Sequence, residues 1–123
     1  RLPWGNLGMT ICYDLRFPFL YKKLAKKGAH FFSVPAAFTY TTGITHWESL
    51  LRARAIENGC YVFAPAQCGY HDNGRRTFGN SMIIDPWGTI LKRAKHSIGL
   101  ISCNIDLEKV NFYRKRIPAM TEY

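Results

Sequence analysis

Cys12 is the residue whose type and position point most directly to chemistry. It ends the mostly apolar run 7–12, which predicts a buried strand, and Arg16, Phe17 and Pro18 then lead into a helix. A strand that passes into a helix exposes a side chain at the carboxyl end of a sheet. The backbone N–H groups that follow would lower the pKa of the thiol and stabilise an oxyanion. The position is typical of a cysteine nucleophile. The alternative is a small buried apolar residue, which is the commoner fate of a free cysteine.

The groups that would assist such a nucleophile are not evident. A nucleophilic thiol needs a base and a group that stabilises charge, yet no histidine is spaced to form a Cys–His pair, and the papain-type, GxSxG, Walker and GxGxxG motifs are absent. Cys60 and Cys103 lie in apolar, strand-like segments and are interpreted as structural, whereas Cys68, at the start of a loop, stays ambiguous. Scattered cysteines without a CxxC pair favour reduced, intracellular thiols, and the histidine spacing predicts no metal site.

The elements that must position Cys12 follow from hydrophobic periodicity. Two helices each cross between strands, and a hairpin around the type I turn 85–88 follows them. This order of two β-α units followed by consecutive strands and a last helix indicates an α/β fold with a mixed sheet and both cross-over helices on one face. Residues 36–44 and 69–79 are expected to be loops. The predicted strands are 7–12, 30–35, 60–65, 80–85, 89–94 and 99–106, and the helices begin near residues 17, 45 and 107.

Composition excludes several classes of protein. The 123 residues are 47% hydrophobic and 20% charged, which excludes disorder and low complexity and allows at most one domain or part of one. The net charge of +9 permits nucleic-acid binding. However, the lysines between residues 22 and 27 fall on the solvent-exposed side of one predicted helix, and no RNP-like aromatic motif accompanies them. Nucleic acid is therefore the least favoured partner. No apolar stretch approaches the roughly 20 residues of a membrane helix.

Several longer segments resemble the nitrilase superfamily, the carbon–nitrogen hydrolases. The segment around Cys12 is similar to the nucleophile motif of that family, and the others follow in the family's order with compatible gaps. Residues 67–69 also resemble the Nit branch, the deaminated glutathione amidases. The matching segments are Gly8–Pro18, Thr42–Glu48, Arg52–Asn58 and Gly79–Gly88.

This resemblance implies an αββα sandwich of which residues 1–123 form the C-terminal part of a single domain. It also implies a Glu–Lys–Cys triad without a cofactor. The cysteine attacks an amide or nitrile carbon, the glutamate acts as the base, the lysine holds the oxyanion, and water releases the acid. Only the cysteine has a counterpart here, Cys12, because none of the eleven residues before it is Glu or Lys. A chain that begins at Arg1 rather than Met fits the expectation of a piece of a longer protein. Glu48 is interpreted instead as part of a capping box with Thr45 and as a partner of Arg52.

The resemblance further assigns roles around Cys12. Tyr13 would give its backbone N–H to the oxyanion, and Phe38 and Thr39 would line the pocket. Arg16 is expected either to clamp a substrate carboxylate, as suits deaminated glutathione or an ω-amide acid, or to pair with Asp14 or with an acidic residue elsewhere.

The expected protein is thus an amidase that uses a small amide and water, forms a homodimer and binds neither nucleic acid nor membrane. Its expected location is the cytoplasm, with the mitochondrion left open. The alternative is a non-catalytic interaction module or pseudoenzyme of the same fold, because the triad is incomplete in this chain.

Overall fold

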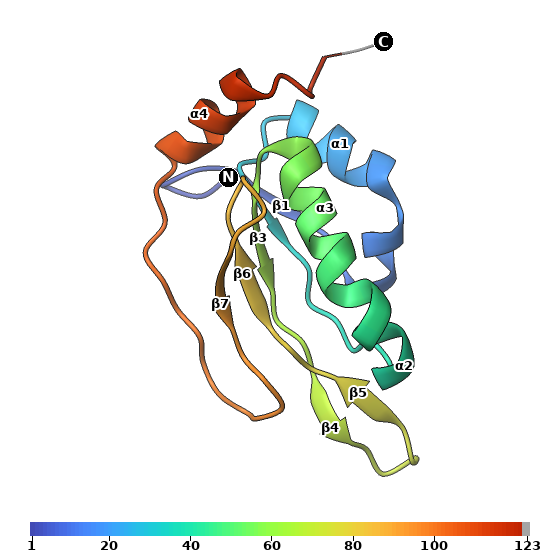
Figure 1. Cartoon of the computed structure of the whole chain (residues 1–123). Helices are drawn as coiled ribbons and strands as arrows, with labels where there is room; N and C mark the ends of the chain where they lie inside the picture. Colours follow the sequence, from blue (N-terminus) through green and yellow to red (C-terminus); the bar gives the residue numbers. More distant parts are fainter. Residues whose placement is uncertain (122–123) are drawn as a thin grey trace.

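A computed structural model describes residues 1–121 of the chain (Figure 1). Two irregular helical segments accompany the regular elements, a 3-10 helix at Cys12–Arg16 and a π-helical segment at Gly43–Trp47. The strands are β1 Leu7–Met9, β2 Phe31–Ser33, β3 Tyr61–Ala64, β4 Cys68–Tyr70, β5 Arg76–Phe78, β6 Met82–Ile84 and β7 Ile90–Arg93, and the helices are α1 Pro18–Lys26, α2 Tyr40–Thr42, α3 Glu48–Asn58 and α4 Glu108–Arg116.

Five strands form one mixed sheet in the order β1-β2-β3-β6-β7. The first three strands are parallel, with Leu7 opposite Phe31 and Phe31 opposite Tyr61, and β6 and β7 complete the sheet as an antiparallel hairpin. Parallel neighbours need a crossover connection, and α1 and α3 provide the two crossovers. The mixed α/β architecture expected from the sequence is confirmed.

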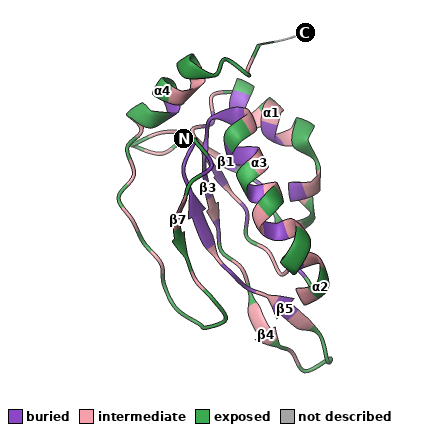
Figure 2. Ribbon diagram, in the orientation of Figure 1, coloured by how far each residue is buried: buried purple, intermediate pink, exposed green. Residues whose placement is uncertain are grey.

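Both crossover helices pack on the same face of the sheet, as predicted (Figures 1 and 2). Alternate strand residues point to this face and are fully buried, for example Phe32, Val62 and Ile84, and they meet Tyr21 of α1 and Leu51 of α3. Each such side chain removed from water stabilises the fold by about 1.5–3 kcal/mol. The core therefore holds the strands whose ends carry the candidate site.

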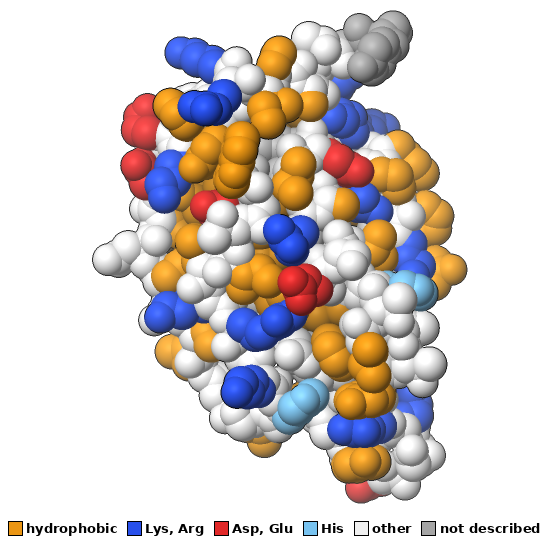
Figure 3. All heavy atoms as spheres, in the orientation of Figure 1, with side chains coloured by type: hydrophobic (Ala, Val, Ile, Leu, Met, Phe, Trp, Pro, Cys, Tyr) orange, Lys and Arg blue, Asp and Glu red, His pale blue; other side chains and the backbone are white. Residues whose placement is uncertain are grey.

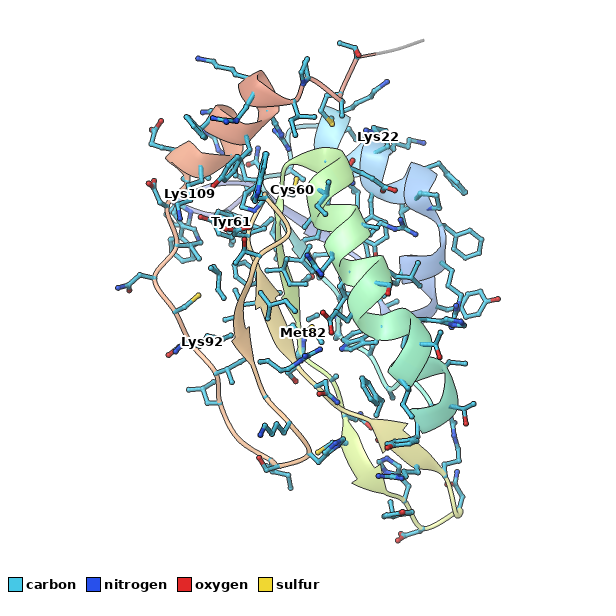
Figure 4. All side chains as sticks on the ribbon, in the orientation of Figure 1. Lys22, Cys60, Tyr61, Met82, Lys92 and Lys109 are labelled. Atoms are coloured by element: carbon cyan, nitrogen blue, oxygen red, sulfur yellow. The ribbon has the colours of Figure 1, made fainter. Side chains whose placement is uncertain are left out.

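The opposite face of the sheet is only partly covered. The chain that leads to α4, and α4 itself, lie beside it, on the side of the labelled Tyr61 and Lys109 (Figure 4). Val110 packs there against Phe31 and Tyr61. Towards β1 the face is open, since Met9 is 78% and Ile11 is 64% exposed. An apolar sheet face that meets water is unusual for a complete sandwich layer.

The segment before α3 differs from the sequence-based expectation. Residues 36–44 were expected to be a loop, but they contain α2 and the start of the π-helical segment, which runs directly into α3. Thr45 therefore lies inside helical backbone, and the predicted capping box with Glu48 is wrong. Glu48 instead pairs with Arg52 at 3.9 Å, as predicted, and with Arg93 of β7. Gly43 permits this packing because any Cβ there would collide with Phe78.

Two other predicted segments also differ. Residues 69–79 form the β4–β5 hairpin rather than a loop, with Gly69 opposite Thr77, because Gly74 at φ 80° allows a tight turn. Residues 99–106 were expected to form a strand, but in the described structure they form no strand and pair with no strand of either sheet. Their apolar composition resembles that of a strand, but the described sheet ends at β7 and these residues do not extend it.

Alkaline pH is expected to destabilise the fold through Tyr21. Its hydroxyl lies 2.8 Å from Thr10 Oγ1, which in turn donates to Ser33 O, and burial raises the pKa of Tyr21 to about 12. Because the unfolded value is near 10, this stabilisation is complete below pH 10 and disappears as the pH rises through 12, amounting to about 3 kcal/mol. Urea unfolding of the whole protein between pH 8 and 11.5 measures the loss. Tyr21→Phe should make the curve flatter above pH 10, and an unchanged slope would contradict this prediction.

Candidate active site

Cys12 lies three residues after β1, where the backbone turns from the strand into the 3-10 helix. Its φ is 45°, so it adopts a left-handed conformation that costs a non-glycine residue roughly 1–2 kcal/mol. Its backbone N–H donates to Pro35 O at 2.8 Å, which fixes the residue against the end of β2. Strained backbone conformations of this kind cluster at functional sites, so the positive φ of this half-buried cysteine points to a function.

The turn at Cys12 is fixed by hydrogen bonds on both sides. Thr10 N–H donates to Ser33 O at 3.0 Å and so extends the β1–β2 pairing. The Asp14 carboxylate accepts from the N–H of Ile11 at 2.9 Å, and the N–H of Asp14 donates to Ile11 O at 3.0 Å. Among the described residues the N–H of Tyr13, which follows Cys12 directly, has no acceptor.

Cys12 lines a groove of about 910 Å³ that lies along the carboxyl ends of β1, β2 and β3 and the open sheet face. This volume suits a small organic ligand. Among the residues that the structure describes, none of the groove-lining side chains is Asp, Glu, Lys or Arg, so the wall is mainly apolar. The polar exceptions are Gln67, Cys68, His71, Ser81 and Ser97.

Arg16 lies outside this groove, on the helical side of Cys12. Its guanidinium donates from Nη1 to His46 Nδ1 at 3.2 Å and lies 5.1 Å from the centre of the Phe38 ring and 5.7 Å from that of Tyr13. Asp14, the structural partner considered from the sequence, accepts instead from Ile11. Arg16 and Cys12 thus lie at the two ends of one short 3-10 helix, and Arg16 has no acidic partner on the described chain.

Phe38 and Thr39 also lie outside the groove-lining set. Phe38 is buried against Trp47, with ring centres 4.9 Å apart, and Thr39 Oγ1 pairs with Thr42 Oγ1 at 2.8 Å. The backbone at these residues contacts β5, since Thr39 bridges to Thr77. The structure therefore places both residues beside the β4–β5 hairpin, and the ring of Phe38 also contacts Arg16.

Other residues line the groove although the sequence analysis did not assign them to it. Pro35 and Ala36 follow β2, Gln67 follows β3, and His71 begins the turn of the β4–β5 hairpin. Their shared signal is a position just past the carboxyl end of a strand, where α/β sheets bind ligands. Recognising it required the strand order, which places β1, β2 and β3 next to one another.

The four cysteines differ in environment and form no disulfide in the described structure. Cys60 is buried, donates to Ala29 O at 3.3 Å and accepts from Arg114, and burial raises the pKa of its thiol to about 11. It is structural, as predicted. Cys68 begins β4, is half-buried and lines the groove.

Two kinds of feature are absent from residues 1–121. No three side chains of the types that bind metal come together to hold an ion. No helix there has both the length and the apolar character required to cross a bilayer. On the face shown in Figure 3, Lys and Arg side chains are spread among hydrophobic ones rather than gathered in a stripe.

Comparison with known proteins gives consistent matches along the chain. Residues 1–115 match the family model described as carbon–nitrogen hydrolase. A deaminated glutathione amidase from Synechocystis sp. is 52% identical over 117 residues, which are 95% of this chain and 43% of the relative. The crystal structure of the C. elegans NitFhit protein is 48% identical with a TM-score of 0.90, over 93% of this chain and 28% of that one.

A third comparison bears on the cysteine. The structure of a mutant of the amidase from Nesterenkonia sp. is 32% identical to this chain with a TM-score of 0.67, and the match covers 76% of this chain and 35% of the amidase chain. In that structure the acetamide moiety of fluoroacetamide is covalently added at the active site cysteine. This chain spans less than half the length of each of these three proteins.

Proposed function

The chain belongs to the carbon–nitrogen hydrolase family, and from this we propose that it carries the nucleophile of an amidase that cleaves a small, carboxylate-bearing amide. The observation that carries the proposal is Cys12, which has a left-handed backbone, lines the groove and lies next to the unpaired N–H of Tyr13. A relative named deaminated glutathione amidase at 52% identity supports the same reaction and suggests that compound as the substrate.

In the proposed reaction the base takes the proton of the Cys12 thiol, the sulfur attacks the amide carbon, and the carbonyl electron pair moves onto oxygen. The N–H of Tyr13 donates to this oxyanion. Collapse of the tetrahedral intermediate breaks the C–N bond, the amine leaves with the proton that the base took from the thiol, and a thioester remains on Cys12. A water molecule, deprotonated by the same group acting as a base, then attacks the thioester. The acid is released, and the sulfur of Cys12 is free again.

We propose that the base and the lysine come from parts of the whole protein outside these 123 residues. Glu57 pairs with Arg54 at 3.3 Å, and Glu48 pairs with Arg52 and Arg93, so both carboxylates have structural partners. Neither lines the groove with Cys12.

The open, apolar sheet face beside the groove suits a further layer of the same domain. Residues 1–123 would then be the C-terminal part of one αββα domain, in a protein that pairs as a homodimer.

Arg16 is proposed to bind the substrate carboxylate nearest the scissile bond, because it lies one helical turn after Cys12 and has no acidic partner on the described chain. In the whole protein we expect hydrolysis of deaminated glutathione. Arg16→Met should raise KM about 10- to 100-fold, the range for one hydrogen bond to a charged group.

Arg16→Lys should recover the affinity only in part, because an ammonium group cannot bind a carboxylate in bidentate fashion. Lys23→Met, which removes one exposed charge from α1, is the control. A whole protein that hydrolyses no amide would favour the non-catalytic module instead.

A further inference from the structure

His71 is a second chemically distinctive residue in the groove that contains Cys12. Among the described residues, its imidazole is the one side chain lining the groove that can carry a positive charge. The ring is also held in place, since Nε2 lies 2.7 Å from Oγ1 of Thr77, and Thr77 is only 3% exposed. No other hydrogen bond of the ring is found in the described chain, so Nδ1 is free to meet a ligand.

The hairpin that carries His71 is fastened to the rest of the molecule. Its turn is closed by the N–H of His71, which donates to Arg75 O at 2.8 Å, and by the N–H of Gly74, which donates to His71 O at 2.9 Å. Arg76 stacks on the ring of Tyr40 of α2, with its guanidinium carbon 3.5 Å from the ring centre. This fastening gives His71 a defined position, as a recognition residue requires.

The strand order separates His71 from the nucleophile. Cys12 bonds to Pro35 at the end of β2, and Ala36 bridges to Ala66 at the end of β3. Two strand spacings of about 4.8 Å place Cys12 about 10 Å from residue 66, and His71 follows five residues later. Cys12 and His71 thus line the same groove from the ends of different strands, so one extended ligand can contact both side chains.

From these observations, and resting on the proposed function, we propose that His71 binds the carboxylate at the far end of the substrate. Thr77 acts as its positioning residue by holding Nε2. The ligand class is a short peptide-like acid whose scissile amide lies at Cys12 and whose terminal carboxylate reaches the β4–β5 hairpin. Arg16, which lies outside the groove on the helical side of Cys12, and His71, which lines the groove, would then bind opposite ends of a substrate that passes Cys12.

The test compares two substrates in the whole protein, deaminated glutathione and its C-terminal carboxamide, which differ only in the far carboxylate. The native protein should have the lower KM for the acid. His71→Leu should raise that KM about 10- to 100-fold, as for one hydrogen bond to a charged group, with kcat and the KM of the carboxamide nearly unchanged. Thr77→Val should raise it about fivefold, and Thr77→Ser, which keeps the hydroxyl, should restore the native value.

Binding provides a readout that does not depend on turnover. In the Cys12→Ala protein, calorimetry should show that adding His71→Leu weakens binding of the acid but not of the carboxamide. Equal effects on both ligands, or a preference for the acid that survives His71→Leu, would overturn this inference and leave the proposed function intact. A fall in kcat for both substrates would place His71 in the chemistry and also overturn it. No hydrolysis of either substrate would overturn the proposed function itself.

Discussion

Replacing Cys12 with alanine in the whole protein will lower kcat for amide hydrolysis by at least about 10³-fold, while KM changes little. The loss is large because removal of a covalent nucleophile leaves only binding and oxyanion stabilisation. Cys12→Ser should be nearly as inactive, since a hydroxyl without a lowered pKa is a poor nucleophile. Release of the carboxylic acid, measured under substrate saturation, gives the comparison.

The matched control is Cys103→Ala, because Cys103 is also half-buried but lies outside the groove. Its kcat should stay within twofold of the native value. Activity that survives in Cys12→Ala, or an equal loss in both variants, would mean that the reaction does not pass through this sulfur.

Replacing Arg54 with methionine will lower the free energy of unfolding by about 3 kcal/mol. Arg54 lies on α3, is only 4% exposed and donates from Nε and Nη2 to Leu15 O at 3.1 and 2.8 Å. Its guanidinium also lies 5.6 Å from the centre of the Tyr21 ring. Methionine keeps much of the volume but leaves the buried carbonyl of Leu15 and the carboxylate of Glu57 unpaired, which is costly.

The matched control is Arg52→Met on the same helix. The Arg52 side chain is 49% exposed, and its pair with Glu48 spans 3.9 Å, so the loss should stay below about 1 kcal/mol. Denaturant unfolding of the three proteins measures both values. Equal losses would contradict the role given to Arg54.

Arg54 also connects stability to the site. Leu15 belongs to the 3-10 helix that begins at Cys12, so the two hydrogen bonds from α3 hold that helix in position. We therefore expect Arg54→Met to lower kcat at temperatures where the protein is still folded. Native activity in a folded variant would show that the turn at Cys12 keeps its geometry without this support.

Local signals in the sequence predicted the regular part of the fold. Pro18 begins α1 and Gly28 follows its end, while Asp85 accepts from the N–H of Trp87 and of Thr89 in the predicted β6–β7 turn. These features depend on a few neighbouring residues. The π-helical segment depends on contacts distant in sequence, such as Gly43 against Phe78, and local patterns do not show it.

The candidate site also combines features that local sequence predicts with features that only the tertiary fold creates. The strand-to-helix junction at Cys12 could be read from residues 7–18, but the positive φ of Cys12 has no sequence signal. His71 and Gln67 enter the groove only because the strand order places β3 two strands from β1. Local sequence thus pointed to the proposed nucleophile, whereas the walls of the groove follow from topology.

The measurement that most directly tests the central proposal is the mass of the peptide that contains Cys12 after rapid acid quenching of the whole protein with deaminated glutathione. The proposal predicts that this peptide gains the mass of the acyl part of the substrate, that hydroxylamine removes it as expected for a thioester, and that Cys12→Ala abolishes it. Steady hydrolysis with an unmodified Cys12 peptide, or an acyl group on Cys68 instead, would contradict it.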